Sequence, residues 1–472
     1  MQNNRYCSTV LGPLLLAALV SAIPLLAATR PPNIVFLFAD DLGHGALGCY
    51  GQKKILTPNL DRLSAEGMRF TQCYAGANVC APSRSTLMTG LHTGHTPVRN
   101  NGRKRFLHDS DITLAEVLKK AGYATGGFGK WGLGDIETPG VAIKQGFDEW
   151  LGYYHQVHAH FYYPYWLLKN NTKFLLPENE GGQNRRYSHD VIQEHALDFI
   201  RRHRDRPFFC YVPYTIPHVE LTVPEDSEKA YRGQFPRRTI KDPRPGYLSS
   251  DDAYATYAGM VSRLDRSVGE VLALLKDLKL DQDTIVFFSS DNGAQGNQWQ
   301  PLIDFFDGTG GLRGSKGTWY EGGIRDPLLA RWPGKIKAGA VTDHVCAFWD
   351  FMPTLAELAG VEPPKNLDGI SFAPTLLGEG AQRKHDFLYW EMPVAKGLTQ
   401  AVRMGDWKAV KARPNGPMEL YHLGIDPKET TDVAAQNPEV MKQIQNYLAT
   451  VRTEERAYPE EESPPGIKDY VR

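Results

Sequence analysis

The segment NIVFLFADD, residues 33–41, is the most informative part of this 472-residue chain about its fold. Five consecutive large apolar side chains, Ile34 to Phe38, are typical of a strand that is buried on both faces of a sheet. Ala39 follows the run, and two carboxylates, Asp40 and Asp41, come directly after it. Strands of this kind occur in sheets that helices cover on both sides, so the segment predicts an α/β protein.

Further apolar runs alternate with amphipathic segments along the chain. We predict strands over 123–128, 207–213 and 284–288, and helices over 113–120 and 250–278. Strands joined by helices form a mostly parallel sheet, and ligands bind beyond the carboxyl ends of its strands. The pattern therefore predicts a large mixed, mostly parallel sheet sandwiched by helices.

Polar side chains follow four of the predicted strands. They are Asp40 and Asp41 after the first, Lys130 after the second, His218 after the third, and Asp291 and Asn292 after the fourth. Because the carboxyl ends of parallel strands lie at one edge of a sheet, we expect these side chains to converge on one site.

The composition of the chain changes near residues 369–383, a stretch that contains Gly and Pro. Beyond it, we predict short antiparallel strands over 387–391, 400–404 and 407–410, and a terminal helix over 438–452. The sequence thus predicts a main domain over 31–375 and a smaller C-terminal α+β domain over 384–472.

The first 28 residues have the pattern of a secretory signal peptide. Arg5 precedes an apolar run over 10–28 that Pro13 and Pro24 interrupt and small residues end. We expect export to the periplasm or the medium and no stable membrane span. The net charge of −1 provides no general attraction to nucleic acid, so no nucleic-acid partner is expected.

The cysteines after residue 28 are odd in number: Cys49, Cys73, Cys80, Cys210 and Cys346. An odd cysteine in an exported protein calls for a special explanation, and Cys80 supplies one below. The other four are able either to pair or to remain buried thiols.

The segment around Cys80 reads Cys-Ala-Pro-Ser-Arg over 80–84, and Met-Thr-Gly follows over 88–90. This arrangement resembles the signature of type I sulfatases. Other family-like segments follow the family's order at 39–41, 129–131, 217–218, 291–293 and 314–317, so the resemblance spans nearly all of the chain after residue 28. It implies an alkaline-phosphatase-like fold and a sulfuric ester hydrolase. It also implies that a maturation enzyme oxidises Cys80 to formylglycine before folding is complete.

The resemblance assigns roles to the other site residues. Arg84 is expected to brace the formylglycine, and Lys130 and Lys316 are expected to contact the sulfate oxygens and stabilise developing charge. His218 is expected to protonate the departing alcohol. A formylglycine hydrate is a gem-diol, and one of its hydroxyls is able to attack sulfur.

The expected metal ligands are Asp40, Asp41, Asp291, Asn292 and residue 80 itself. Carboxylate and amide oxygens suit Ca²⁺ or Mg²⁺ and argue against zinc, and the resemblance favours Ca²⁺ over Mg²⁺. A cation would also relieve the repulsion between neighbouring carboxylates. Taken alone, the pair Asp40 and Asp41 is equally consistent with a solvated turn.

One position departs from the family pattern. Many members have His two residues after the lysine, where this chain has Gly132. That His commonly helps to remove a proton from the gem-diol, which Gly132 cannot do. Either another base, such as a metal carboxylate, replaces it, or a different His does. His155, His158 and His160 are candidates by sequence position only.

Three segments bear on the choice of substrate. The aromatic segment 150–166 would either supply aromatic faces for a sugar ring or form a packed lobe. Residues 297–299 would line the same cleft as Asp291. The basic stretch 237–244 would either attract a sulfated polymer or form a solvated loop. Together with export, the aromatic segment favours a sulfated carbohydrate over an aryl sulfate.

Two other functions compete with this interpretation. A phosphate or phosphonate ester hydrolase of the same superfamily would share the nucleophile, and matched sulfate and phosphate esters would separate the two. A non-catalytic protein that binds sulfated glycans would keep Cys80 unmodified, which leaves a soft thiol beside a hard cation.

Overall fold

The structure is a computed structural model that describes residues 1–458 except 4–5, 7, 9–29, 103 and 245. The predicted signal peptide therefore lies largely outside the described residues. The described residues from 31 onward form one compact unit. No helix among the described residues is long and apolar enough to cross a membrane.

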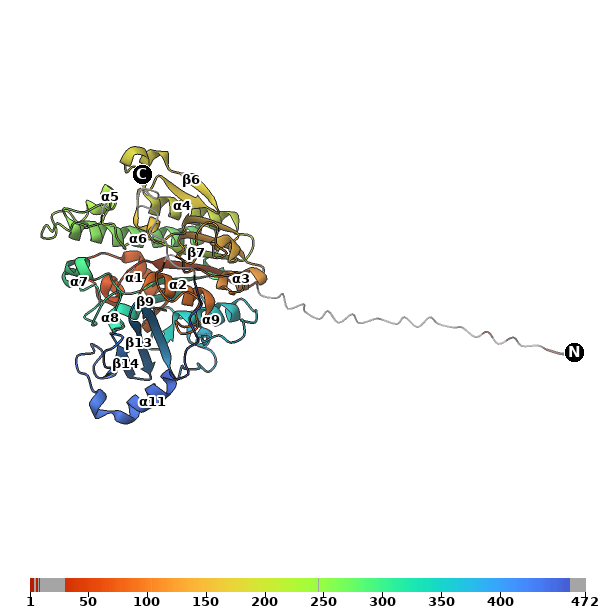
Figure 1. The fold of residues 1–472 in the computed structure, drawn as a ribbon. Coiled ribbons are helices and arrows are strands. Elements are labelled where there is room, and N and C mark those ends of the chain that lie inside the picture. The colour runs from red at the N-terminus through yellow and green to blue at the C-terminus, as the bar shows by residue number, and fades with distance from the viewer. Residues whose placement is uncertain (4–5, 7, 9–29, 103, 245, 459–472) are drawn as a thin grey trace. The chain divides into compact units, whose positions relative to one another are not determined.

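The compact unit contains a large mixed sheet and a small antiparallel sheet (Figure 1). The large sheet is built from β1 (Asn33–Ala39), β2 (Met68–Tyr74), β3 (Ala124–Lys130), β4 (Glu149–Tyr153), β5 (Trp166–Lys169), β6 (Thr172–Leu175), β7 (Phe208–Pro213), β8 (Thr284–Ser290), β9 (Arg325–Arg331), β10 (Ala340–Thr342) and β11 (Cys346–Ala347). Its order is β10-β2-β9-β8-β1-β7-β3-β4-β5-β6, and β11 also pairs with β2. The predicted fold class is confirmed.

The central strand β1 pairs in parallel with β7 on one side and β8 on the other. β3 continues the parallel part beyond β7. In this register Phe38 lies opposite Pro213, and Ala39 lies opposite Ser290. The three strands therefore end together, and the residues that follow them meet at one edge of the sheet.

Helices cover both faces of the large sheet. They are α1 (Pro58–Ala65), α2 (Cys80–Thr89), α3 (Leu114–Lys120), α4 (Ser188–Arg202), α5 (Glu225–Glu228), α6 (Ala253–Asp277), α7 (Gln300–Phe306), α8 (Glu321–Ile324), α9 (Phe351–Leu358) and α10 (Ala373–Leu377). Figure 1 shows α4 and α6 on one side of β7 and α9 on the other.

Alternate residues of β1 pack into two different cores. Val35 and Leu37 join a core with α1, α4 and α6, whereas Ile34, Phe36 and Phe38 join a core with α2, α3 and α9. Full burial of each such side chain is worth about 1.5–3 kcal/mol. The continuous apolar run in the sequence is thus explained by a strand with two buried faces, as predicted.

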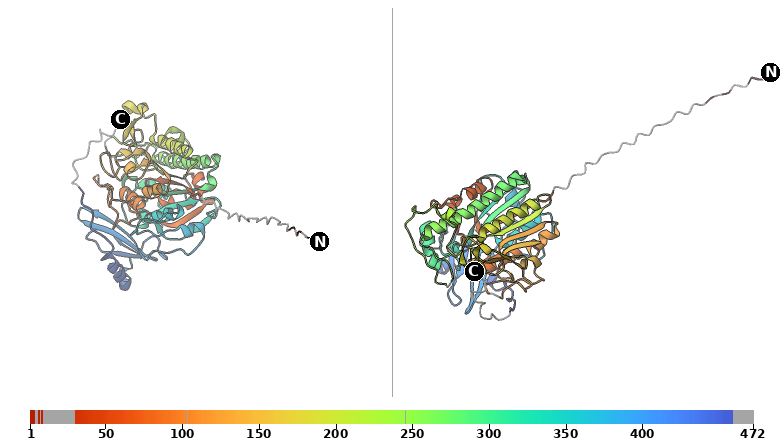
Figure 2. Two further views of the ribbon diagram at one scale, coloured as in Figure 1. Left: turned by 90° about the vertical axis from the view of Figure 1, so that its right-hand side faces the viewer. Right: turned by 90° about the horizontal axis from the view of Figure 1, so that it is seen from above.

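The small sheet has the order β12 (Leu388–Val394), β13 (Gly397–Met404), β14 (Trp407–Lys411) and β15 (Glu419–His422), with α11 (Pro438–Leu448) packed on one face through Ile444. Figure 2 shows this sheet in blue from two further directions. Its other face packs on Tyr74 and Trp349 of the main body. The antiparallel strands and the terminal helix were predicted, but β15 was not, and the domain boundary near residue 384 stays a prediction.

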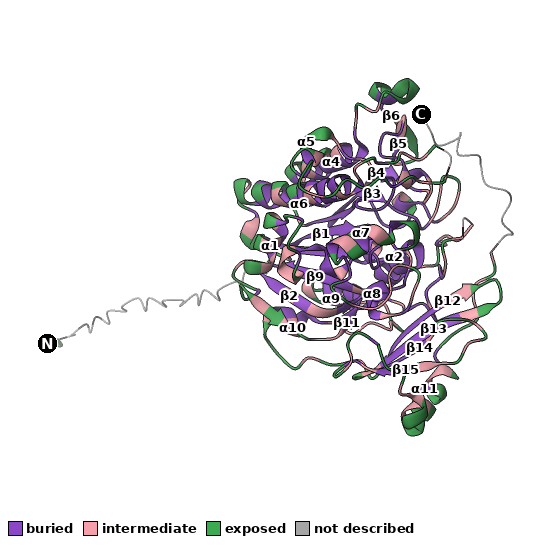
Figure 3. Ribbon diagram, turned by 90° about the vertical axis from the view of Figure 1, so that its left-hand side faces the viewer, coloured by how far each residue is buried: buried purple, intermediate pink, exposed green. Residues whose placement is uncertain are grey.

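Burial follows this layered arrangement. In Figure 3 the strands of both sheets are mostly buried, whereas α11 carries exposed residues on its outer side. The predicted helix over 113–120 begins at Leu114, and Thr113 caps it in a reciprocal pair of hydrogen bonds with Glu116. The predicted strand over 123–128 extends to Lys130, which places this lysine within β3 rather than after it.

Candidate active site

The structure brings all nine predicted site residues to the carboxyl edge of the large sheet. Asp40 and Asp41 follow β1, Asp291 and Asn292 follow β8, Lys130 ends β3, and His218 lies beyond β7. Cys80 and Arg84 lie in the first turns of α2, and Lys316 lies in the loop before α8. All except Lys316 are buried, so the site is a pocket of charged groups inside the protein.

Cys80 is the first residue of α2, and its side chain lies at the positive end of that helix. Its Sγ is 3.5 Å from Asp40 Oδ1, and the residue is 1% exposed. Burial raises the pKa of the Cys80 thiol to about 12, although Lys130 and Lys316 act in the opposite direction. An unmodified Cys80 would therefore be a protonated and poorly reactive thiol at neutral pH.

Arg84 holds the acidic residues in place. Its Nε and Nη2 donate to Asp291 Oδ2 at 3.1 and 2.7 Å, and its Nη1 donates to the Lys130 carbonyl at 2.7 Å. A guanidinium that spans a carboxylate and a carbonyl fixes the geometry of both. Arg84 thereby joins the ends of α2, β3 and β8.

Two lysines contact the paired carboxylates. Lys130 Nζ donates to Asp40 Oδ2 at 2.7 Å, and Lys316 Nζ donates to Asp41 Oδ2 at 2.8 Å. Burial raises the pKa of Asp41 to about 7, and repulsion from Asp40 and Asp291 acts in the same direction. The Lys316 ammonium acts in the opposite direction and lowers this pKa. Asp41 also has a φ of +63°, an uncommon conformation for a residue with a side chain.

The donor set fits a hard divalent cation. Asp40, Asp41, Cys80 and His218 lie close enough together for one ion to bind them. Asn292 Nδ2 donates to Asp41 Oδ1 at 2.7 Å, whereas Asn292 Oδ1 is buried with no hydrogen-bond partner among the described residues. A buried amide oxygen without a partner beside three carboxylates is the arrangement that a hard cation would complete.

His218 has one ring nitrogen fixed and the other directed into the site. Nδ1 lies 2.9 Å from the Val219 carbonyl, so it carries the proton, and Nε2 lies 2.9 Å from Lys316 Nζ and 3.2 Å from Asp41 Oδ2. Tyr162 Oη lies 2.7 Å from both the Thr215 and His218 carbonyls. Burial and then Lys316 lower the pKa of His218 well below its usual value.

The three candidate histidines near Gly132 lie in different places. The His160 ring stacks on His218 with centroids 4.5 Å apart, and its Nδ1 bonds Tyr247 Oη at 2.7 Å. His155 lines a cavity beside Gly132, and His158 is buried against Trp166. The side chain nearest to a substituent at Gly132 is Gln156, which sequence reasoning did not single out.

The aromatic segment packs mostly as core. Its large residues Trp150, Tyr153, Tyr154, Tyr162 and Tyr163 are buried, which favours the packed lobe over a sugar-binding surface. Of residues 297–299, only Trp299 is buried, and it lines a small cavity with Asp41. Gln295 was missed. With its amide correctly oriented, it donates to Asp41 Oδ2 at 2.6 Å.

The basic stretch is mostly solvated, because Arg237, Arg238 and Lys241 are exposed. Arg244 is the exception: it pairs with Asp242 and stacks on Tyr247 at 3.8 Å. No disulfide links the five described cysteines. The exposure of Arg237, Arg238 and Lys241 favours the solvated loop over a surface that binds a sulfated polymer.

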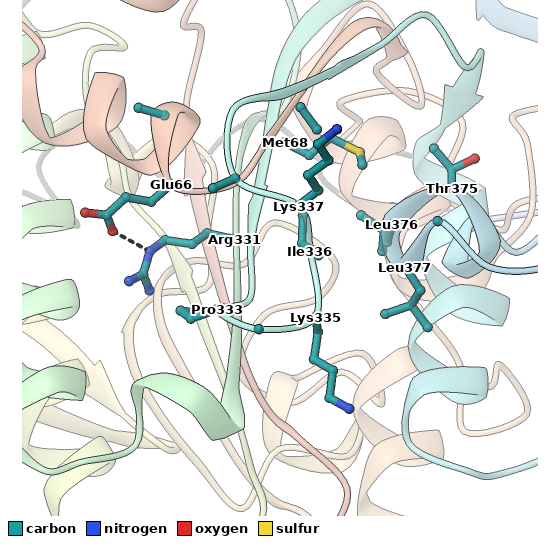
Figure 4. Close-up of a pocket in the computed structure, with 15 residues that line it drawn as sticks. Glu66, Met68, Arg331, Pro333, Lys335, Ile336, Lys337, Thr375, Leu376 and Leu377 are labelled. Atoms are coloured by element: carbon teal, nitrogen blue, oxygen red, sulfur yellow. Dashed lines mark hydrogen bonds and ion pairs between the residues drawn. The ribbon is translucent and has the colours of Figure 1, made fainter.

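A separate cavity of about 710 Å³ lies between β10 and α10, away from the edge of the sheet that carries the acidic cluster (Figure 4). Arg331, which lines it, is in register with Val286 near the start of β8, whereas Asp291 follows the end of that strand. The cavity is therefore remote from the acidic cluster and plays no part in it.

Comparison with known proteins agrees with this geometry. The Sulfatase family matches residues 32–361, and a family described as N-sulphoglucosamine sulphohydrolase, C-terminal, matches residues 315–455. The chain is 34% identical to arylsulfatase A of Homo sapiens over 89% of this chain and 87% of that protein. It is 33% identical to N-acetylgalactosamine-6-sulfatase of Canis lupus familiaris, over 88% and 78%.

Solved structures show the same architecture. The chain superposes on the crystal structure of Ps i-CgsB in complex with k-i-k-neocarrahexaose with a TM-score of 0.75, at 27% identity, over 89% of this chain and 93% of that chain. A buried cluster of acids, lysines and a cysteine in the first turn of a helix, at the edge of such a sheet, is typical of hydrolases of the alkaline-phosphatase-like class. The chain belongs to the sulfatase family and is a sulfuric ester hydrolase.

Proposed function

We propose that this protein hydrolyses sulfate monoesters of carbohydrates with a formylglycine derived from Cys80 and a bound Ca²⁺. The observation that carries the proposal is the cluster of Asp40, Asp41 and the buried residue 80, which Asp291 and the unpartnered Asn292 join through their hydrogen bonds to Asp41. The relatives named above act on sulfate esters by name, and one structural neighbour holds a carrageenan oligosaccharide.

The residues divide the work by charge. Asp40, Asp41, Asp291 and Asn292 would hold Ca²⁺, which would offset the charge of the sulfate group and favour the ionised form of the nucleophile. Lys130 donates to Asp40 and Lys316 donates to Asp41, so both ammonium groups lie beside the expected metal ligands. Both would contact sulfate oxygens as the S–O bond breaks. Arg84 would orient Asp291 and the first turn of α2.

His218 would act on the leaving group. Its fixed Nδ1–H leaves Nε2 as the only ring nitrogen that faces the site, next to Lys316. For this role Nε2 would take up a second proton, supplied by the neighbouring Lys316 ammonium, and would pass it to the departing alkoxide oxygen as the bond to sulfur breaks. Return of the aldehyde would then need a base, and Asp40 lies 3.5 Å from the residue 80 side chain.

The proposal extends to maturation and location. A formylglycine-generating enzyme would convert Cys80, and the segment 1–28 would direct export to the periplasm or the medium. The main part over 31–375 would carry the chemistry and the part over 384–472 would support it.

Mass analysis of the peptide that contains Cys80 tests the proposal in protein produced together with a maturation enzyme. We expect an aldehyde in place of the thiol and bound calcium by elemental analysis. Cys80→Ser should abolish sulfate ester hydrolysis, and Asp291→Ala should lower both calcium content and rate. An intact thiol in active protein would contradict the assigned nucleophile.

A second candidate, hydrolysis of phosphate or phosphonate esters, is favoured by one observation only. The chain has the same fold as a phosphonate monoester hydrolase of Agrobacterium radiobacter, with a TM-score of 0.66 at 22% identity. Rates on sulfate and phosphate esters with the same leaving group separate the two functions. A faster phosphate reaction would replace the proposed one, and an unmodified Cys80 with bound sulfated glycan but no turnover would indicate a binding protein.

A further inference from the structure

We propose that a cavity next to Cys80, which we call the Gln156 cavity, binds a hydroxyl-bearing substituent of the sugar that carries the sulfate ester. The cavity is lined by Ala81, Asn101, Arg105, Asp135, Tyr154 and Gln156, among others, and its volume is about 100 Å³. The inference rests on the proposed function and identifies the residues that would choose the substrate.

The cavity is lined by two residues that are near the site residues in the chain, Ala81 and Gly132. Ala81 follows Cys80 in the first turn of α2, and its backbone N–H donates to Asn101 Oδ1 at 2.9 Å. Gly132, which also lines the cavity, comes two residues after Lys130, the lysine that contacts Asp40. A group that occupies the cavity would therefore lie beside a sulfate held by Lys130.

Gly132 and Gln156 depend on each other. Gly132 has a φ of +78°, and a Cβ at this position would lie 2.1 Å from Gln156 Nε2. No side chain fits at residue 132 while Gln156 keeps its place, because real atoms do not approach so closely. Because residue 132 is glycine, the carboxamide of Gln156 occupies the space that a side chain at this position would fill.

Two hydrogen-bond donors in the wall have no partner. Gln156 Nε2 and Arg105 Nε are both buried, and neither bonds any residue in the described part of the chain. Such donors are costly in a protein interior unless a ligand or water accepts from them. A ligand oxygen in the cavity would satisfy one of these donors or the other.

The remaining groups favour a neutral hydroxyl over an anion. Asp135 lines the same cavity, and Glu455 lies 4.0 Å from Arg105 Nε, so negative charges already balance the guanidinium. A hydroxyl accepts from Gln156 or Arg105 and donates to a carboxylate, whereas a second sulfate would be repelled by Asp135.

The size of the cavity sets the size of the group. A water molecule takes about 30 Å³ in the liquid, so about 100 Å³ holds roughly three waters. That space accommodates a hydroxyl or hydroxymethyl substituent, while the ring itself remains outside. Small aryl sulfates have no such substituent and would leave the cavity unused.

The test compares Gln156→Leu with the parent protein on three kinds of substrate. They are the best substrate in a panel of sulfated monosaccharides, its analogues that each lack one hydroxyl, and 4-nitrophenyl sulfate. We expect kcat/KM on the sugar to fall about tenfold, with the aryl sulfate within about twofold of the parent rate. One deoxy analogue should show the same loss in the parent and no further loss in the variant.

Gln436→Leu, at an exposed position in the C-terminal part, serves as the matched control and should change none of these rates. Gly132→Ala should displace Gln156 and reproduce the sugar-selective loss. An equal fall on sugar and aryl sulfate, or no change on any sugar, would overturn the proposal.

Failure of the proposed function would be visible separately, as an absence of sulfate ester hydrolysis in the parent protein. In that case, calorimetry of sulfated monosaccharides binding to Cys80→Ser protein tests the cavity assignment without turnover. Weaker binding with Gln156→Leu added supports the cavity assignment, and unchanged binding or none at all overturns it.

Discussion

Replacement of Lys408 by Met should destabilise the contact between the two sheets and, through it, the loop that carries Lys316. Lys408 lies on β14 and is fully buried. Its Nζ donates to Glu321 Oε1 at 2.8 Å and lies 3.0 Å from Glu429 Oε1. Methionine keeps most of the volume but removes the positive charge, which leaves two buried carboxylates close together.

The magnitude follows from the state of Glu321. Burial would raise the pKa of this carboxyl, but Lys408, with Arg325 and Arg403, lowers it to about 2 from an ordinary value of 4.5. A difference of this size corresponds to about 3 kcal/mol of stability at neutral pH. Removal of one partner of a buried ion pair costs about 3–5 kcal/mol. This figure agrees in order of magnitude with the value derived from the pKa of Glu321.

The pH dependence has a defined sign. A carboxyl whose pKa is lowered by folding stabilises the folded state above the unfolded pKa of 4.5, and this contribution is lost as the pH falls from 4.5 towards 2. The parent protein should therefore lose this contribution over that range. Lys408→Met should already have lost it at pH 7, because the Glu321 charge is no longer favoured.

Urea unfolding followed by tryptophan fluorescence is the assay, since Trp319 and Trp390 both lie in the core between the sheets. The midpoint should fall in Lys408→Met and recover in part when Glu321→Gln is added, because the second change removes one uncompensated charge. An unchanged midpoint in the single variant, or a further fall in the double variant, would refute the reasoning.

Three further predictions concern the site. Arg84→Met, which removes the double contact with Asp291, should lower kcat by about a hundredfold or more with little change in KM, as steady-state kinetics would show; a change in KM alone would contradict it. Asn292→Leu should reduce bound calcium measured after dialysis while the circular dichroism spectrum stays unchanged, whereas full calcium retention would exclude this residue as a ligand. Tyr162→Phe, which frees the carbonyls of Thr215 and His218, should cost about 1 kcal/mol in urea unfolding and lower kcat more than KM; an unchanged rate would show that Tyr162 does not position His218.

The prediction about Lys408 gives the small sheet a role in the active site. After Lys316, the chain passes through Trp319, whose Nε1 donates to Thr399 of β13 at 2.9 Å. The Glu321 N–H then donates to Glu429 at 2.7 Å. Since Lys316 Nζ contacts Asp41, the small sheet anchors the segment next to a predicted sulfate-binding lysine.

The central strands could be predicted because each is buried on both faces and therefore reads as an unbroken apolar run. β1, β7 and β8 are of this kind. β2 and β9 were missed because their sequences contain charged residues, and Pro327 interrupts β9. Both strands nevertheless lie between two neighbours in the sheet, so their charged residues hid the apolar pattern without marking an exposed edge.

The candidate site was predictable to a similar degree. Its acids and lysines follow strand ends or family-like segments, so topology brought them together as expected. Gln156 and Gln295 had no such signal, because each approaches the site through the path of a loop. For the tyrosines of 150–166 the sequence left two alternatives open, since aromatic residues suit a core and a sugar surface equally well.

The burial of Cys80 bears on the order of maturation and folding. The residue is 1% exposed, its Sγ contacts Asp40, and Ala81 behind it is tied to Asn101. A maturation enzyme needs the side chain in its own active site, which would require α2 to leave the sheet edge and Arg84 to release Asp291. Since that release leaves a buried carboxylate without its partner, conversion of the folded protein would be opposed by several kcal/mol. Conversion of the unfolded chain would meet no such barrier, which agrees with the expectation from the family resemblance that Cys80 is oxidised before folding is complete.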